Sequence, residues 1–270
     1  MKLSILISTL DAGIKKVRAV LLEPLTDVTY YLSHQVTTER FLAIPPELKR
    51  KDVVVSQIEG RGMCRNRNNT LKIAGGDIAL LADDDVRYKP EYFQRITEAF
   101  ASDQTLDVAC FKISTPAGER EYKEYSTTPY KLNEESRHYI SSIEIAVRLA
   151  VVRNKNIFFD ERFGLGSQYI QFGEEAVFIY DCIRAGLQVK YIPEYIVEHT
   201  ATSTAAKSTE FDRVRVIFKG AYDAHRYGWK AFPAALLGTL TLWPKLRAER
   251  KSPLRYFQER LSGAGYIFCK

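Results

Sequence analysis

The sequence predicts an α/β fold, with a doubly wound and mostly parallel sheet flanked by helices and followed by a C-terminal helical extension. Two observations support this prediction. Over the first 115 residues, short apolar runs typical of buried strands alternate with helix-like stretches. One of these runs, residues 78–82, ends abruptly in three consecutive aspartates, Asp83, Asp84 and Asp85. The carboxyl end of a strand is where open α/β sheets bind ligands.

The strands of the first half are predicted at residues 3–8, 28–32, 53–57, 78–82 and 108–113. A helix is expected over residues 64–74, because Gly75 and Gly76 follow it as a C-terminal stop. A second helix begins near Pro90, since proline is favoured in the first helical turn. Its buried face is predicted to hold Phe93, Ile96 and Phe100.

The second half is predicted to be mainly helical. An amphipathic helix is expected from four apolar residues at helical spacing, which are Ile140, Ile143, Val147 and Ala150. A further helix opens at Gly173, and a strand follows over residues 188–192, where Pro193 ends it. Residues 201–209 are rich in Ala, Ser and Thr and predict a flexible loop. From Phe211 onward the pattern predicts another helix.

The composition is that of an ordinary globular protein, with 46% hydrophobic and 27% charged residues. The formal net charge of +6 suggests anionic partners, but no nucleic-acid-binding motif accompanies it, so we expect no nucleic-acid binding. The four cysteines are scattered without metal-site spacing, which favours free thiols. The N-terminal apolar run is interrupted by Ser4 and Ser8 and lacks a cleavage site, so we interpret it as a strand. We expect a cytoplasmic protein.

The acidic triplet is the strongest indication of function in the chain. Carboxylates repel one another and are costly to desolvate, so a buried strand has little structural use for three of them at its tip. Hard divalent cations such as Mg²⁺ or Mn²⁺ bind oxygen ligands and bridge carboxylates to substrate phosphates. The alternative interpretation is a solvated acidic turn, since aspartate is common in turns. The position directly after an apolar strand favours the cation site.

Three further features stand in a characteristic order around the triplet. The helix upstream of it opens with the arginine-rich residues 60–68. A carboxylate pair, Glu174 and Glu175, begins a later helix, and His199 follows the next strand. A cation beside a phosphate and a carboxylate that accepts a proton are what transfer from a nucleoside diphosphate requires.

This order resembles the family 2 glycosyltransferases, whose nucleotide-sugar-binding fold is called GT-A. The resemblance runs from about residue 2 to residue 199. The family's Ala-Arg-Asn motif corresponds to Cys64-Arg65-Asn66, and its Asp-x-Asp motif corresponds to the acidic triplet. The family's Gly-Glu-Asp motif corresponds to Gly173-Glu174-Glu175.

The resemblance implies a division of the chain. Residues 1–209 would form the glycosyltransferase domain. Its nucleotide-sugar-binding half would be residues 1–115, and its acceptor and catalytic half would be residues 116–209. Residues 210–270 would form the C-terminal helical extension.

Carried over residue by residue, the resemblance also implies a role for each motif. The residues that would bind the donor are Thr9, Arg65, Asn66, Asp83 and Asp84. A Mn²⁺ or Mg²⁺ ion would be held by Asp83, Asp85 and His199. Glu175, in place of the family's usual aspartate, would be the general base. Glu174 is the alternative base, in which case the helix dipole accounts for Glu175.

Some of these positions depart from the family pattern or allow a structural interpretation. Residues 33–35, Ser-His-Gln, occupy the place of an acidic pair that serves the nucleotide. His199 is also interpretable as a half-buried histidine or a helix cap, and His34 is expected to be structural or exposed. A solvated basic face is the alternative for Arg61, Arg65 and Arg67.

The sequence therefore predicts an inverting, metal-dependent glycosyltransferase. It would transfer a sugar from a nucleotide-sugar donor, for which we favour a UDP-sugar, to a hydroxyl of a saccharide or lipid-linked acceptor in cell-surface polysaccharide synthesis. Direct attack from the face opposite the leaving group would invert the anomeric carbon. The alternatives are a haloacid-dehalogenase-type phosphotransferase with Asp83 as nucleophile and a non-enzymatic basic protein that binds anions.

The C-terminal region predicts contact with a membrane surface. Residues 231–244 are unusually apolar and bounded by prolines, with Trp229 and Trp243 near their two ends, but they are too short to span a bilayer. Residues 245–260 add six basic residues against two acidic ones. We expect residues 229–260 to attach peripherally to the anionic inner face of the membrane. The alternative is a core helix packed on the sheet and followed by a solvated basic helix.

Overall fold

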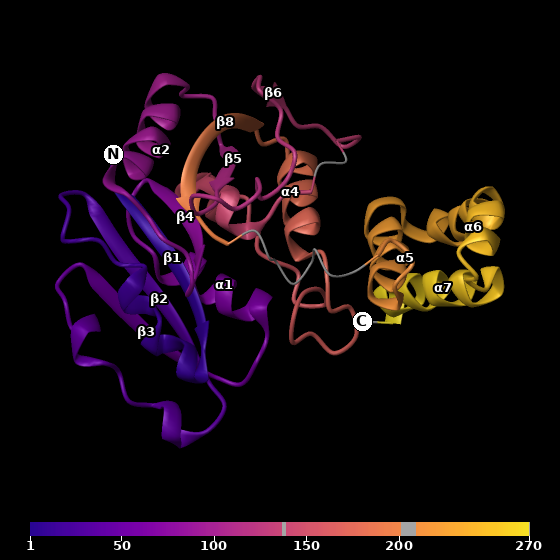
Figure 1. Cartoon of the computed structure of the whole chain (residues 1–270), viewed down its shortest axis with the longest axis horizontal. Helices are drawn as coiled ribbons and strands as arrows, with labels where there is room; N and C mark the ends of the chain where they lie inside the picture. The colour runs from indigo at the N-terminus through magenta and orange to yellow at the C-terminus, as the bar shows by residue number, and fades with distance from the viewer. Residues whose placement is uncertain (137–138, 201–208, 270) are drawn as a thin grey trace. The chain divides into compact units, whose positions relative to one another are not determined.

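The structure is a computed structural model of the whole chain, and it describes residues 1–136, 139–200 and 209–269. The chain folds into two compact units. The first, called here the sheet unit, comprises Met1–Phe159 and Phe178–Thr202. The second, called here the helical unit, comprises Asp160–Val177 and Ser203–Lys270. Figure 1 shows the strands in the first and the three C-terminal helices in the second.

Within the described residues, the sheet unit holds eight strands in the spatial order β3-β2-β1-β4-β7-β5-β8-β6. Strands β1 to β4 pair in parallel, as do β5 and β8, whereas β7 runs antiparallel between β4 and β5. The prediction of a mostly parallel sheet is therefore confirmed. The strands are β1 Leu3–Leu10, β2 Val28–Val36, β3 Val53–Glu59, β4 Ile78–Asp83, β5 Val108–Ser114, β6 Tyr130–Lys131, β7 Ile145–Arg148 and β8 Val189–Glu198.

Two hydrophobic cores cover the two faces of the sheet. Side chains of a strand alternate between its faces, and in β1 Ile5 and Ile7 enter one core while Leu6 enters the other. The first core includes Phe93 of α2, and the second includes Leu71 of α1. The helices of the sheet unit are α1 Met63–Ile73, α2 Pro90–Ser102 and α3 Leu149–Asn154, and α4 Glu174–Arg184 begins in the helical unit.

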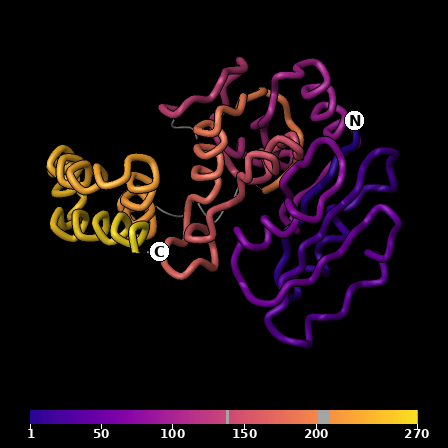
Figure 2. The backbone as a smooth tube through the Cα atoms, turned by 180° about the vertical axis from the view of Figure 1, so that it is seen from behind, coloured from indigo at the N-terminus to yellow at the C-terminus, as the bar shows by residue number. Residues whose placement is uncertain are grey.

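Short 3₁₀ helices complete the connections. Those of the sheet unit are η1 Asp11–Lys15, η2 Val17–Ala19, η3 Glu39–Phe41, η4 Pro46–Leu48 and η5 Ser142–Glu144. The tube in Figure 2 shows the loops that follow β1 and β2. The first of these connections, η1, directly follows the strand end that carries Thr9.

The helical unit is built from α5 Arg213–Tyr227, α6 Ala231–Ala248 and α7 Pro253–Cys269, with η7 Gly228–Lys230 between the first two. Glycines let α5 and α7 approach closely. A Cβ atom on Gly220 would lie 1.9 Å from the carbonyl oxygen of Arg260, and one on Gly263 would lie 2.0 Å from that of Ile217. Arg260 is buried and forms an ion pair with Asp223. The prediction of a helix from Phe211 onward is confirmed by α5.

The prediction of a helix around Ile143 and Val147 is wrong, because residues 145–148 form strand β7. Ile145, Ala146 and Val147 are each fully buried between neighbouring strands. A strand covered on both faces is apolar throughout, so its sequence cannot be distinguished from a buried helix by periodicity alone. The pairing with β4 and β5 decides the structure.

The predicted end of a strand at Pro193 is also wrong, since β8 continues to Glu198. Its pairing with β5 is irregular there: Tyr191 lies opposite Cys110 and Tyr195 opposite Lys112. After the pair of Tyr191 and Cys110, the four residues 192–195 of β8 thus match the two residues 111 and 112 of β5. Pro193, which has no N–H to donate, falls inside this bulge.

The remaining predictions concern the domain boundaries, the loop at residues 201–209, the apolar C-terminal segment and the cysteines. Residues 160–177, which we expected in the glycosyltransferase domain, belong to the helical unit together with α5 to α7. The flexible loop expected at 201–209 lies, apart from Thr209, outside the described residues. The apolar segment 231–244 lies within helix α6, which continues through Pro244. The four cysteines are free, as predicted.

Candidate functional site

The candidate site lies at the carboxyl ends of the parallel strands β1, β2 and β4. In the register of these strands, Ser8 lies beside Asp83 on one side and Ser33 on the other, and Thr9 lies beside His34. The end of β1 and the acidic triplet therefore share one edge of the sheet. This is the position at which open α/β sheets bind ligands.

Asp83 and Asp84 contact different partners, so each carboxylate has its own neighbouring polar or basic group. Asp83 faces the buried Arg67, with Oδ1 3.5 Å from a guanidinium nitrogen. Asp84 accepts a hydrogen bond from the Thr9 hydroxyl and lies 4.0 Å from the ammonium group of Lys16. Burial raises the pKa of Asp84, and the Thr9 hydrogen bond acts in the opposite direction.

Asp85 is the most exposed aspartate of the triplet and is paired with His199. The carboxylate Oδ1 lies 3.5 Å from Nε2 of His199, whose Nδ1 is 2.8 Å from the carbonyl oxygen of Thr200. The hydrogen bond between the two side chains lowers the pKa of Asp85 and raises the pKa of His199. Tyr122 packs edge-on against the imidazole. The structure therefore brings together two of the three predicted metal ligands.

The main chain brings His199 to Asp85. Arg87, two residues after Asp85, exchanges two backbone hydrogen bonds of 2.9 Å with Glu198 at the end of β8. The backbone N–H of His199 donates to Ser114 at the end of β5. These contacts join residues far apart along the chain, which the sequence alone does not reveal.

A glycine lets the first 3₁₀ helix approach the acidic triplet. A Cβ atom on Gly13 would lie 2.3 Å from Oδ2 of Asp84 and 2.5 Å from Oγ1 of Thr9. No side chain larger than hydrogen fits there without movement of these groups. Gly13 thus belongs to the site, and its place after the first strand is the only indication of this in the sequence.

The arginine-rich start of α1 divides into one exposed and one buried side chain. Arg65 is exposed, and its guanidinium lies near Gly60. Arg67 is 4% exposed, donates to the Ser142 hydroxyl at 2.7 Å and lies over the Phe159 ring. The solvated basic face is therefore wrong for Arg67. Its position three residues after the buried Cys64 would have placed it on the inner face of the helix.

Asn66 is buried, and its side-chain amide donates to the carbonyl oxygen of Thr9 at 2.9 Å. Its position holds the end of β1 against α1. In the part of the chain that the structure describes, the side-chain oxygens of Asn66 and Ser8 are buried and have no hydrogen-bond partner. Buried polar atoms are normally satisfied, so such atoms at a strand edge fit a site that receives a polar ligand or water.

The loop that follows β1 also belongs to the site, although the sequence did not predict this. Asp11 has a positive φ of 50° and accepts hydrogen bonds from the backbone N–H and hydroxyl of Thr37, both at 2.8 Å. His34 is fully buried, with Nε2 2.9 Å from the carbonyl oxygen of Asp11 and Nδ1 3.1 Å from the side-chain nitrogen of Gln57. Because Gln57 donates to Nδ1, Nε2 carries the proton, and burial lowers the pKa of this neutral imidazole. His34 is thus structural, as expected, and fixes the ends of β1 and β2.

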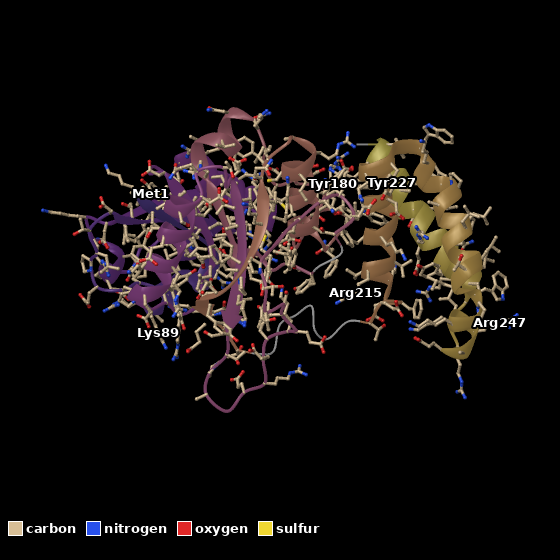
Figure 3. The ribbon with its side chains drawn as sticks, turned by 90° about the horizontal axis from the view of Figure 1, so that it is seen from above. Met1, Lys89, Tyr180, Arg215, Tyr227 and Arg247 are labelled. Atoms are coloured by element: carbon tan, nitrogen blue, oxygen red, sulfur yellow. The ribbon has the colours of Figure 1, made fainter. Side chains whose placement is uncertain are left out.

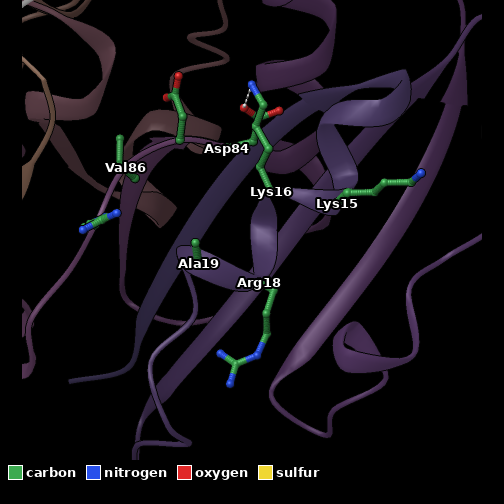
Figure 4. Close-up of a pocket in the computed structure, with 8 residues that line it drawn as sticks. Lys15, Lys16, Arg18, Ala19, Asp84 and Val86 are labelled. Carbon is green, nitrogen blue, oxygen red and sulfur yellow. Dashed lines mark ion pairs between the residues drawn. The ribbon is translucent and has the colours of Figure 1, made fainter.

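A shallow cavity of ≈ 650 Å³ opens beside Asp84 and Asp85 (Figure 4). Figure 4 shows the side chain of Lys16 reaching toward Asp84, whereas those of Lys15 and Arg18 point away from it. The residues that line the cavity are Lys15, Lys16, Arg18, Ala19, Asp84, Asp85, Val86 and Arg87. Four of them are basic, so the cavity beside Asp84 and Asp85 is lined by positive as well as negative charges.

The predicted catalytic pair opens α4. Gly173 has a φ of 83°, and a Cβ atom on it would lie 2.0 Å from the ring of Phe218 in α5. The glycine is therefore required both by the backbone and by the neighbouring ring. Glu174 is 7% exposed, and Glu175 is partly exposed. The structure assigns both carboxylates to the helical unit and the acidic triplet to the sheet unit.

Among the described residues, no three His, Cys, Asp or Glu side chains form a group that could hold a metal ion. The pair of Asp85 and His199 supplies one carboxylate and one imidazole. A Mg²⁺ site normally takes one or two carboxylates and completes its shell with waters and substrate phosphates, so the Asp85 carboxylate fits such an ion, whereas an imidazole is a ligand that transition metals favour.

The model of the family described as Glycosyl transferase family 2 matches residues 39–161. The matched segment covers less than half of the chain. The matched segment includes Arg65, Asn66 and the acidic triplet. It leaves outside Thr9, His199 and the predicted catalytic pair of Glu174 and Glu175. The match supports a glycosyltransferase over the phosphotransferase and over the non-enzymatic anion-binding protein. A sequence search among curated proteins finds no match.

Solved structures of S. aureus TarS are similar to this chain. TarS 1–349 in complex with UDP-GlcNAc matches with a TM-score of 0.60 and 17% identity, over 83% of this chain and 66% of that one. TarS 1–349 in complex with UDP matches with a TM-score of 0.58 and 19% identity, over 80% and 65%. For TarS itself the values are 0.57 and 18%, over 83% and 40%. The likeness confirms the predicted GT-A-type fold, and the chain spans less than two thirds of these TarS chains.

Proposed function

We propose that this chain is an inverting, metal-dependent glycosyltransferase that uses a UDP-sugar donor. The observation that carries the proposal is the acidic triplet at the carboxyl end of β4, inside the segment matched by the family 2 model. Two of the similar TarS structures contain UDP or UDP-GlcNAc. Among the described residues, the side-chain oxygens of Ser8 in β1 and of Asn66 in α1, which contacts the end of β1, are buried without a hydrogen-bond partner, and this supports a polar ligand there.

In the proposed reaction, each group at this edge has a separate task. Thr9 and Asp84, joined by their hydrogen bond, lie beside the nucleotide, with Asn66 holding the end of β1. The exposed Arg65 orients the phosphates. Asp85 and His199, with Asp83 as the third predicted ligand, would hold Mn²⁺ or Mg²⁺, and such an ion would supply positive charge beside the diphosphate leaving group. Arg67 stays buried and places its positive charge beside Asp83.

Glu175 is the proposed general base. The hydroxyl of a sugar acceptor is a poor nucleophile, so a carboxylate must accept its proton. Glu175 is more exposed than Glu174 at the start of α4, and this favours Glu175 as the group that meets an acceptor. Attack of the acceptor oxygen on the anomeric carbon breaks the bond to the diphosphate and inverts that carbon.

The acceptor is proposed to be a saccharide or a lipid-linked glycan of cell-surface polysaccharide synthesis. A lipid-linked acceptor would be reached at the inner face of the cytoplasmic membrane, to which residues 229–260 would attach the chain. No helix in the described part of the chain is long and apolar enough to cross a membrane. Attachment would therefore be peripheral.

The donor is tested by thermal unfolding of the full chain with a panel of nucleotide sugars, with and without Mn²⁺. A ligand at 100 times its dissociation constant adds about 2.7 kcal/mol to the unfolding free energy. We expect a UDP-sugar to raise the midpoint only when Mn²⁺ is present. The Asp85→Ala variant should fold as the parent does and lose this metal-dependent shift. Equal shifts in parent and variant would refute the metal assignment, and no shift with any nucleotide sugar would refute the proposed donor class.

A further inference from the structure

Helix α6 has an exposed side that is almost entirely apolar. Its buried side is narrow. The buried residues lie at helical spacing and are Ala231, Ala235, Thr239 and Leu246. The opposite side carries large apolar residues with exposed fractions of 39% for Phe232, 48% for Leu236, 64% for Leu237, 54% for Leu240 and 43% for Trp243. Residues three and four positions apart share a helix face, so these side chains form one continuous surface.

The packing of the helical unit shows why this surface stays uncovered. Helix α6 contacts α5, α7 and η7 within its own unit. Those contacts use the narrow, buried side of α6. Figure 3 shows side chains of the helical unit that extend outward from its ribbons. The structure assigns α6 to the helical unit, together with α5 and α7. Soluble monomers seldom expose a contiguous apolar patch of this kind without a binding function.

The charges around the surface are mainly basic, although Glu249 is exposed at the C-terminal end of α6 and Lys245 forms an ion pair with Glu210. Residues 231–244 contain no charged side chain, and Lys230 directly precedes them. At the other end stand Lys245 and Arg247 in the last turn of α6, and then the exposed Arg250 and Lys251. Arg247 is labelled at this end of the helix in Figure 3. Basic residues at both ends of an apolar surface complement an anionic one.

Two tryptophans complete the pattern. Trp229 is 69% exposed just before α6, and Trp243 is 43% exposed near its end. Tryptophan is enriched where apolar and aqueous phases meet, because its ring is apolar and its N–H seeks a polar partner. With 18 residues, α6 is about 27 Å long and is suited to lie along an interface rather than to cross it.

We propose that α6 is the membrane-binding element of this chain, inserting its apolar side between the lipids of an anionic phospholipid bilayer. The basic residues at its two ends would contact the headgroups. The proposal deepens the proposed attachment of residues 229–260 and, through it, rests on the proposed function. Binding to lipid does not require sugar transfer, so the two can be tested separately.

The test is co-sedimentation of the full chain with vesicles of phosphatidylcholine alone and of phosphatidylcholine with phosphatidylglycerol. We expect binding to the anionic vesicles that weakens as salt is raised. The double variant Leu237→Glu, Leu240→Glu should bind at least about a hundredfold more weakly, because two charges replace apolar groups in the inserted side. Glutamate favours helices and both leucines are exposed, so the variant should fold.

The matched control is Leu42→Glu, Leu165→Glu, which changes two leucines of 49% and 52% exposure elsewhere and alters the net charge equally. It should lose only the small part of the binding that depends on total charge. A second variant, Arg247→Gln, Lys251→Gln, should reduce binding to anionic vesicles about tenfold or more and leave the weak binding to neutral vesicles unchanged.

Three results would overturn the proposal. The first is no binding to either kind of vesicle, and the second is equal binding by the α6 variant and its control. The third is a dimer of the parent in sedimentation velocity that becomes a monomer in the α6 variant, because a second copy would then cover this surface. If vesicle binding fails while a UDP-sugar still shifts the thermal midpoint, only the membrane proposal is lost.

Discussion

At the scale of single residues, three adjacent aspartates acquire three different environments. Asp83 is paired with the buried Arg67, Asp84 is hydrogen-bonded to Thr9, and Asp85 faces His199. Only Asp85 is more than half exposed, at 51% of its side chain. The carboxylates are therefore not interchangeable, and the most accessible one is best suited to bind a cation shared with a substrate.

Gly13 gives the first prediction at this scale. The Gly13→Ala variant should bind a UDP-sugar about tenfold more weakly, because the new methyl group must displace Asp84 or Thr9. The loss should appear as a smaller thermal shift with donor and Mn²⁺. Ala12→Ser, a comparable enlargement at the exposed neighbour, serves as the control. Normal donor binding by Gly13→Ala would mean that the Asp84 contact is dispensable.

The carboxylate pair gives the second prediction. Glu175→Gln should lower kcat by roughly 10²- to 10⁴-fold with little change in donor affinity, as expected when a general base is removed. Glu174→Gln should have a smaller effect on kcat. The assay is initial-rate kinetics with a soluble acceptor. If Glu175→Gln turned over normally and Glu174→Gln were inactive, Glu174 would be the base.

At the scale of elements, close backbone approach determines how the helices of the helical unit pack. Helices α5 and α7 meet at Gly220 and Gly263, where backbone atoms take the space that side chains would need. Gly265 lies two residues further along α7, and a Cβ atom added to it would meet no atom of the described residues within 4 Å. The two glycines of α7 therefore differ in what surrounds them.

This contrast predicts opposite effects of one substitution. Gly263→Ala should destabilise the helical unit by about 1–3 kcal/mol, because the methyl group would overlap the carbonyl oxygen of Ile217. Gly265→Ala should be neutral or stabilising by up to about 1 kcal/mol, since alanine favours a helix. Urea unfolding followed by circular dichroism measures both. Equal destabilisation by the two variants would contradict the close crossing of α5 and α7.

At the scale of the whole molecule, each unit has its own apolar cores. Two clusters fill the sheet unit, and smaller clusters around Phe163, Phe211 and Ala224 fill the helical unit. The proposed donor site lies wholly on residues of the sheet unit, whereas the α6 surface belongs to the helical unit. Units with separate cores can unfold with different stabilities.

We therefore expect two transitions in calorimetric unfolding of the full chain. Gly263→Ala should lower the midpoint of one transition, and a UDP-sugar with Mn²⁺ should raise the midpoint of the other. The transition that each perturbation moves is then assigned to the unit that contains the substituted residue or the bound ligand. A single transition that both perturbations move would show that the two units unfold together.

Much of the fold could be predicted from the sequence, because its signals are local. The strands β1 to β5 and the helices α1 and α2 follow from short apolar runs, glycine stops and a first-turn proline, each read within about ten residues. The acidic triplet at the end of β4 is equally local. The resemblance to family 2 glycosyltransferases rests on similarly short motifs, of which the match at residues 39–161 covers Cys64-Arg65-Asn66 and the acidic triplet but not Gly173-Glu174-Glu175.

Tertiary structure decided what depends on contacts between distant segments. Residues 145–148 became a strand because β4 and β5 offered backbone partners, although their apolar pattern also suited a helix. The bulge that admits Pro193, the pairing of Asp85 with His199 and the burial of Arg67 arise in the same way. Hydrogen bonding and burial act between residues that are near in space, and the sequence records only nearness along the chain.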